Sequence, residues 1–249
     1  MPPHSFSIQR FGSLSSTQDE ARAQARAGAP SGTLILAAEQ LAGRGRQGRV
    51  WESPAGLGLT FTVIHRTARP PAEWPLFTLA ASLGMSEGID PFGIASRLKW
   101  PNDLLLSGRK VAGTLADTER SAILIGIGLN VLQKEEDFPE PLRDIATSIA
   151  IECGREGRVP PSIEDLLDSI LCGLERRLRD LEGAGGEPIL AAFWSRCSDR
   201  GRRIEVRLPS GESMTGEAIG LGSAGALLLS TESGVLPLSA GEIVRRVAP

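Results

Sequence analysis

The alternation of apolar and polar positions predicts several short strands in the first half of the chain. Apolar runs at residues 34–38 and 59–64 are typical of strands. Two further runs, at residues 110–115 and 123–127, are separated by turn residues and predict a meander. Leu-rich strands joined by tight turns favour antiparallel pairing.

Apolar residues spaced three to four positions apart predict helices between and after these strands. Thr17 and Glu20 have capping-box spacing, which predicts a helix start near Ser15. The polar residues 131–144 indicate a loop, and residues 1–13 show no recognisable element. The predicted helices cover residues 15–27, 75–88, 163–182 and 188–197.

From residue 201 onward the pattern changes to short alternating stretches broken by glycine. A segment of about 50 residues with this texture is typical of a small β-barrel. We therefore expect a larger domain over residues 1–198 and a smaller one over residues 199–249. A chain of 249 residues is long enough for both.

Composition narrows the class of protein. The chain is 41% hydrophobic and 23% charged, as in ordinary soluble globular proteins, and its net charge of −3 argues against a general polyanion binder. Three unevenly spaced cysteines and two histidines argue against a disulfide framework or a zinc centre, so the cysteines are interpreted as packing residues. No signal peptide or membrane span is visible, which predicts a cytoplasmic protein.

Residues 40–51, Gln-Leu-Ala-Gly-Arg-Gly-Arg-Gln-Gly-Arg-Val-Trp, are the most unusual stretch, and we call them the Arg/Gly loop. Glycine lets backbone N–H groups approach a ligand, and arginine provides planar donors for phosphate or carboxylate. The loop is either an anion clamp or a solvated loop without a specific role. A second candidate is Lys110, because only three of the 27 basic residues are lysines.

Four motifs in order resemble biotin protein ligases over nearly the whole chain. They are Gly-Arg-Gly-Arg-x-Gly-Arg-x-Trp, Lys-Trp-Pro-Asn-Asp-Leu, Gly-Arg-Lys-Val-Ala-Gly and Gly-Ile-Gly-Leu-Asn. The resemblance implies an α+β fold, with a class II synthetase-like mixed sheet flanked by helices and a C-terminal SH3-like barrel. It also implies activation of biotin by ATP to biotinyl-adenylate, followed by transfer to a lysine of a biotin carboxyl carrier protein of acetyl-CoA carboxylase or a related carboxylase.

Such a reaction brings a carboxylate and a polyphosphate together, so their repulsion must be neutralised. Lys110 is the candidate for the cation that both anions share, since an ammonium is a point charge that can bridge two oxygens. Arg46 is the second catalytic candidate, and Arg44 and Gly45 are expected to line the biotin and phosphate side with it. A solvated lysine after a turn is the alternative interpretation of Lys110.

The resemblance also implies a pocket for the ureido end of biotin, formed by Ser16, Thr17, Gln18 and Gln40. Hydroxyls and amides suit a group that presents both donors and an acceptor. The family commonly has Asn where this chain has Gln18, so the longer amide is expected to reach differently. A plain helix cap is the alternative interpretation of the Ser-Thr segment.

Trp51 and Trp100 are candidate ligand walls or core residues. Asn102, Asp103 and Asn130 are candidates to orient ATP, with Mg²⁺ near Asp103 and Asn130, although Asn102-Asp103 is also good turn chemistry.

A lipoate ligase would share the fold, and an RNA-binding protein could use the Arg/Gly loop. The negative net charge and lack of interleaved aromatics count against RNA. About 14 residues precede the Ser-Thr segment, so we expect no DNA-binding module. Some family members are dimers, and the resemblance leaves a homodimer open for this chain.

Overall fold

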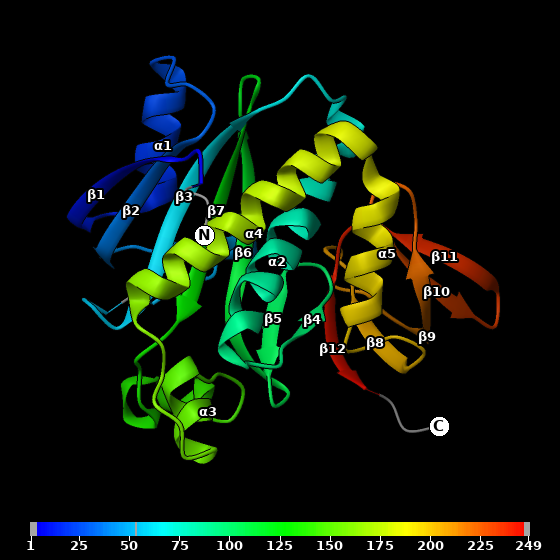
Figure 1. Cartoon of the computed structure of the whole chain (residues 1–249). Coiled ribbons are helices and arrows are strands. Elements are labelled where there is room, and N and C mark those ends of the chain that lie inside the picture. The colour runs from blue at the N-terminus through cyan, green and yellow to red at the C-terminus, as the bar shows by residue number, and fades with distance from the viewer. Residues whose placement is uncertain (1–3, 53, 247–249) are drawn as a thin grey trace.

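Seven strands form a mixed sheet in the order β1-β2-β3-β7-β6-β5-β4 (Figure 1). The computed structural model describes residues 4–52 and 54–246, so the ends of the two predicted domains, 1–3 and 247–249, lie outside the described residues. Strand β1 runs parallel to β2, and each other neighbouring pair is antiparallel. The predicted mixed sheet and antiparallel meander are therefore confirmed. The strands are β1 (Ser7–Leu14), β2 (Thr33–Gln40), β3 (Gly58–Arg66), β4 (Arg97–Lys99), β5 (Asp103–Leu106), β6 (Arg109–Glu119) and β7 (Ala122–Asn130).

The pleat of the strands separates two apolar cores. On β2, Leu34 and Leu36 belong to the large core beneath helices α2 (Pro75–Ile89) and α4 (Ile163–Ala184), while Ile35 packs with helix α1 (Thr17–Arg26). Successive side chains of a strand point to opposite faces, so one sheet carries both cores. Figure 1 shows α2 and α4 together on one side of the sheet. The predicted helices at these positions are confirmed.

Three local expectations need correction. Residues 1–13 include the edge strand β1, whose mostly exposed positions carry little apolar signal. Helix α1 is capped by Ser16, whose Oγ accepts from the Gln18 amide at 3.3 Å, so the Thr17 capping box is wrong. The predicted loop at 131–144 contains two short 3-10 turns, and an unpredicted helix, α3 (Ile149–Arg155), follows it.

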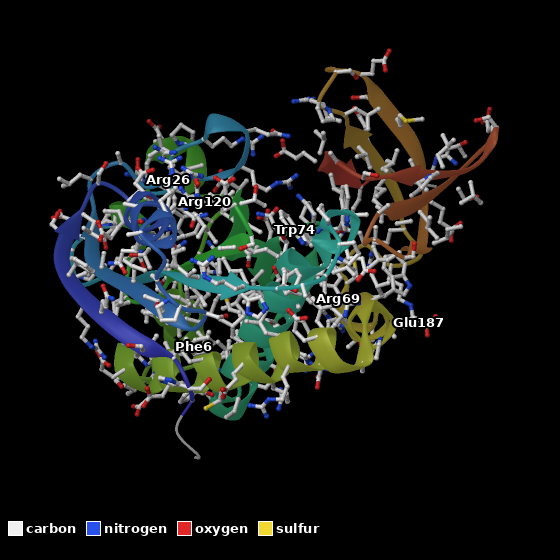
Figure 2. All side chains as sticks on the ribbon, turned by 90° about the horizontal axis from the view of Figure 1, so that it is seen from above. Phe6, Arg26, Arg69, Trp74, Arg120 and Glu187 are labelled. Carbon is white, nitrogen blue, oxygen red and sulfur yellow. The ribbon has the colours of Figure 1, made fainter. Side chains whose placement is uncertain are left out.

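The C-terminal residues form a separate five-stranded antiparallel sheet, in the order β11-β10-β9-β8-β12, beside helix α5 (Gly186–Arg196). Seen from above, these strands stand apart from the large sheet, next to the end of the helical layer that carries Glu187 (Figure 2). Strands β11 and β12 are its two edges, so this sheet is open and a closed barrel is not confirmed. Its strands are β8 (Arg203–Arg207), β9 (Ser213–Leu221), β10 (Leu227–Thr231), β11 (Gly234–Leu238) and β12 (Glu242–Arg246).

Trp100 joins the two parts of the molecule. Its side chain is buried, and its indole N–H donates to the carbonyl of Gly225 at 3.0 Å. Trp100 belongs to the apolar core and also lines the cavity described below, so both roles considered for it stay open. Among the helices of residues 4–52 and 54–246, none combines the length and apolarity that a membrane span requires.

Candidate functional site

A cavity of about 300 Å³ lies on the face of the large sheet that carries α1. The Arg/Gly loop covers it from one side, residues 138–146 from another, and the start of β12 closes the end near β4. All of the site residues predicted from the sequence line this cavity: Ser16, Thr17, Gln18, Gln40, Arg44, Gly45, Arg46, Trp51, Asn102, Asp103, Lys110 and Asn130.

Glycines form the floor of the cavity. Gly126 and Gly128 alternate along β7 with the buried Ile125 and Ile127, so they face the α1 side. A Cβ atom built on Gly128 would lie 2.4 Å from the Trp51 ring. Gly128 therefore leaves the space that the Trp51 indole occupies, and Gly126 leaves space beside Gln18.

The Arg/Gly loop folds as a small hairpin, because Trp51 N donates to Gly43 O at 2.9 Å and Gly45 N to Arg49 O at 2.8 Å. Its arginines bind three different elements. Arg44 pairs with Asp19 of α1 at 2.9 Å, and Arg49 forms a bidentate pair with Glu242 at the start of β12. These side chains are thus ties that hold the loop over the cavity.

Arg46 is the most enclosed of the three loop arginines. Its Nη1 donates to Asn102 Oδ1 at 3.1 Å, and Asn102 Nδ2 donates to the Thr114 carbonyl at 2.8 Å. Burial lowers the pKa of the Arg46 guanidinium, and the carboxylates of Asp103 and Glu242 oppose that shift. An arginine remains charged at neutral pH even so, and the site therefore keeps a fixed, partly desolvated cation.

Lys110 lines the cavity next to Asp103 and Trp51. Its Nζ is 2.7 Å from Asp103 Oδ1 and 5.8 Å from the centre of the Trp51 ring. Its backbone is held from the far side, since Lys110 N donates to Ile145 O and Thr147 N to Lys110 O, both at 2.8 Å. The ammonium of Lys110 thus has an ion-pair partner inside the cavity, although its side chain is 37% exposed.

The opposite end of the cavity is polar and uncharged. Both the amide and the hydroxyl of Thr17 donate to Gln40 Oε1, at 2.8 and 3.0 Å, and Thr62 donates to Thr17 Oγ1 at 2.8 Å. Gln18 is buried, and its Nε2 donates to the carbonyls of Leu115 and Leu124 at 3.3 and 3.4 Å. Its Oε1 has no hydrogen-bond partner in the described part of the chain, which leaves a buried acceptor at this end.

The amide of Asn130 is already engaged. Its Nδ2 donates to Thr147 O at 3.0 Å, and its Oδ1 accepts from Gln133 at 3.3 Å. Over residues 4–52 and 54–246 there is no group of three or more His, Cys, Asp or Glu side chains that could hold a metal ion. Two of the cysteines, Cys153 and Cys197, are buried, and burial raises the pKa of Cys197 to about 11, which fits their interpretation as packing residues.

Sequence reasoning missed a buried carboxylate behind Lys110. Glu152 of α3 accepts from Ser107 at 2.7 Å, from Arg109 at 2.8 Å and from Thr147 at 2.6 Å. Burial alone would raise the pKa of Glu152, but these hydrogen bonds outweigh it and hold the pKa below its usual value. Glu152 thereby ties the turn before Lys110 to the segment that contacts the Lys110 backbone. The N-cap Ser148 was the available signal for this helix.

Comparison with known proteins agrees with this geometry. Residues 11–132 match the model of the biotin/lipoate A/B protein ligase family, and residues 201–246 match that of the biotin protein ligase C-terminal domain. A biotin–[acetyl-CoA-carboxylase] ligase of Mycobacterium tuberculosis is 33% identical over 236 residues, which cover 92% of this chain and 85% of that protein. The chain belongs to the biotin/lipoate protein ligase family.

Other members of this ligase family align over similar lengths. The bifunctional ligase/repressor BirA of Bacillus subtilis is 37% identical, with 92% of this chain and 71% of that protein covered. The structure of a biotin protein ligase from Aquifex aeolicus in complex with biotin and ATP superposes with a TM-score of 0.84 at 27% identity, covering 97% of this chain and 99% of that one. The family fold therefore extends over both sheets of this chain.

Proposed function

We propose that this protein is an ATP-dependent biotin protein ligase. It converts biotin and ATP to biotinyl-adenylate and pyrophosphate, then transfers biotin to a lysine of a biotin carboxyl carrier protein. The observation that carries the proposal is the polarity of one cavity, with an uncharged end at Gln18 and Thr17 and a cationic end at Lys110 and Arg46. Biotin has the matching polarity, a neutral ureido ring at one end and a carboxylate at the other.

The free Oε1 of Gln18 supports the placement of the ureido ring, because a buried acceptor without a partner is costly until a donor reaches it. The ureido N–H groups are such donors. Thr17 and Gln40 are hydrogen-bonded to each other and would fix the wall beside the ring, with Ser16 holding the start of the helix. Gln18 then supplies through its longer side chain what the family's usual Asn supplies.

In the first step, a carboxylate oxygen of biotin attacks the α-phosphorus of ATP, and the bond from phosphorus to the bridging oxygen of pyrophosphate breaks. Lys110 reduces the repulsion between the two anions and stabilises the negative charge in the transition state. Arg46, Arg44 and the Gly45 backbone also line the cavity, and we infer that they contact the phosphates. Positioning and charge are what such a transfer requires from a protein.

In the second step, the amine of the acceptor lysine attacks the acyl carbon of the mixed anhydride, and AMP leaves. The printed name of the Mycobacterium tuberculosis relative specifies acetyl-CoA carboxylase as its acceptor. We infer that the acceptor of this chain is the biotin carboxyl carrier protein of that enzyme or of a related carboxylase.

Trp51 would face the nucleotide, because its ring packs against Gly128 next to Lys110. Mg²⁺ would enter with ATP as the metal complex of its phosphates, and Asp103 is the nearest carboxylate to Lys110. Asn102 and Asn130 would act through the positions that their own hydrogen bonds fix, since both amides are engaged with the protein.

The two alternative functions are less well supported. The matched family includes lipoate ligases, but the C-terminal residues match a domain specific to biotin protein ligases. RNA binding by the Arg/Gly loop would have to displace the contacts by which each loop arginine binds another part of this chain. We also propose domains over residues 1–198 and 199–249, the second with an SH3-like topology. A cytoplasmic location, the lack of operator binding and a homodimer stay predictions.

Pyrophosphate release tests the proposal. With Mg-ATP, biotin is expected to stimulate release and lipoate is not. Stimulation by lipoate but not by biotin would favour the lipoate alternative. Salt-sensitive RNA binding that is indifferent to biotin would favour the third function.

A further inference from the structure

The Arg/Gly loop has few apolar contacts that could hold it over the cavity. Most of its residues are exposed, and two of its large apolar side chains, Leu41 and Val50, are 74% and 73% exposed, while Trp51 at its end packs against Gly128. A loop that buries so little apolar surface gains little hydrophobic stabilisation. Before Trp51, the contacts that hold the turn of this loop over the cavity are therefore mainly polar.

Two of the loop's polar contacts join it to residues in the part of the molecule that contains the large sheet, to which the loop itself belongs. Arg44 binds Asp19 of α1, and Arg46 binds Asn102 after β4. The third tie is different, because Arg49 reaches Glu242, which is 193 positions away in the sequence and begins β12. Both Arg49 and Glu242 line the cavity, so this contact lies at its rim.

The contact between Arg49 and Glu242 is a bidentate ion pair. Arg49 Nη1 donates to Glu242 Oε1 at 2.8 Å, and Nη2 donates to Oε2. Two parallel N–H···O bonds fix the orientation of both side chains as well as their distance. Lys99 and Arg207 also face the carboxylate, and together with Arg49 they hold the pKa of Glu242 below its usual value. Glu242 is thus ionised at neutral pH.

We propose that Arg49 and Glu242 are positioning residues that clasp the Arg/Gly loop to the C-terminal sheet and so retain biotinyl-adenylate in the cavity until the acceptor arrives. This rests on the proposed function. A mixed anhydride is hydrolysed if water reaches it, so a ligase gains from a cover that opens slowly. The clasp gives the C-terminal sheet a part in that cover although its strands lie outside the large sheet.

A reciprocal charge exchange tests the clasp. Arg49→Glu and Glu242→Arg each replace attraction by repulsion, and the double variant restores an ion pair with the charges reversed. Biotinyl-adenylate is formed on the protein from labelled biotin and ATP, and its loss is followed after a chase with unlabelled biotin. Each single variant is expected to lose the adenylate about three to five times faster than the unmodified protein, the range of an exposed ion pair, and the double variant to recover most of the difference.

The chain offers a matched control pair. Arg10 of β1 and Glu164 of α4 form a bidentate contact at 2.9 and 2.7 Å, and their side chains are 54% and 62% exposed. The same exchange at this pair is expected to leave adenylate loss unchanged. If it changes adenylate loss as much as the exchange at Arg49 and Glu242, the effect is a general one of surface charge and the proposal is wrong.

Hydrogen exchange gives a second readout that needs no ligand. The amides of Gly45 and Trp51 form the hairpin of the loop, so their exchange is expected to be faster in each single variant and restored in the double variant. If the unmodified protein forms no adenylate, the proposed function fails, and the exchange rates still decide on the clasp. Unchanged exchange in the single variants overturns the clasp. Tighter ATP binding by Glu242→Arg with unchanged adenylate loss also overturns it, because Glu242 would then only occupy the position of a phosphate group beside Arg49.

Discussion

Replacing Lys110 by methionine removes the cation that the mechanism depends on while keeping much of the aliphatic side chain. The ammonium lies 2.7 Å from Asp103, and the two side chains are 37% and 23% exposed. Ion pairs with this degree of solvent contact contribute about 0–1 kcal/mol to stability. The variant is therefore expected to fold, with an unfolding free energy within about 1 kcal/mol of the unmodified protein.

The effect on catalysis is expected to be much larger. Removing one preorganised group that stabilises developing charge typically slows an enzyme by about 10²–10³, or about 2.7–4 kcal/mol. Biotin affinity should change less, because Gln18 and Thr17 at the other end of the cavity are untouched. The expected signature is thus a large fall in the rate of adenylation with a modest change in biotin binding.

Single-turnover formation of biotinyl-adenylate measures this rate directly. Lys134→Met is the matched control, since its side chain is 75% exposed and it does not line the cavity. Adenylation by Lys110→Met within about threefold of the control would refute the role given to Lys110. Equal losses in both lysine variants would show that the effect does not come from the site.

Two further predictions follow from the packing around the cavity. Gly128→Ala would place a Cβ 2.4 Å from the Trp51 ring, so the indole must shift, and we expect the unfolding free energy to fall by about 1–3 kcal/mol and the KM for ATP to rise. Gly12→Ala, where an added Cβ meets no atom within 4 Å, should change neither quantity. An unchanged KM in Gly128→Ala would contradict the role of Trp51. The lowered pKa of Glu152 adds stability that is fully present above the carboxyl's unfolded pKa and is lost as pH falls through its folded pKa. Glu152→Gln should therefore lower the unfolding free energy by about 1–3 kcal/mol at pH 7 and by less in acid; denaturant titrations at both pH values measure this, and a constant difference would argue against it.

The sequence allowed the buried parts of the fold to be predicted because burial leaves a periodic signal. Strand β7 is buried throughout, and α4 carries a regular stripe of leucines, so both were found. Strand β1 was missed since its outward edge is polar and its partner, β2, lies beyond a helix in sequence. Whether the C-terminal strands close into a barrel depends on contacts between distant strands, which local patterning does not specify.

The residues of the candidate site also divide into those that the sequence predicted and those that only the structure shows. Motif order brought Lys110, the Arg/Gly loop and Asn102 to attention, and the fold places all of them around one cavity. Glu152 and Glu242 lie outside those motifs. Glu152 is identified by four converging hydrogen bonds and Glu242 by a partner 193 positions away, and only the folded chain contains either relation.

The central claim is that this chain attaches biotin to an acceptor lysine, and intact-mass spectrometry of a biotin carboxyl carrier domain tests it directly. After incubation with the protein, biotin and Mg-ATP, the carrier domain is expected to gain the mass of one biotin on its acceptor lysine, and to gain none when ATP is omitted or Lys110→Met is used for the same short time. An unmodified carrier domain in the complete reaction would contradict the account.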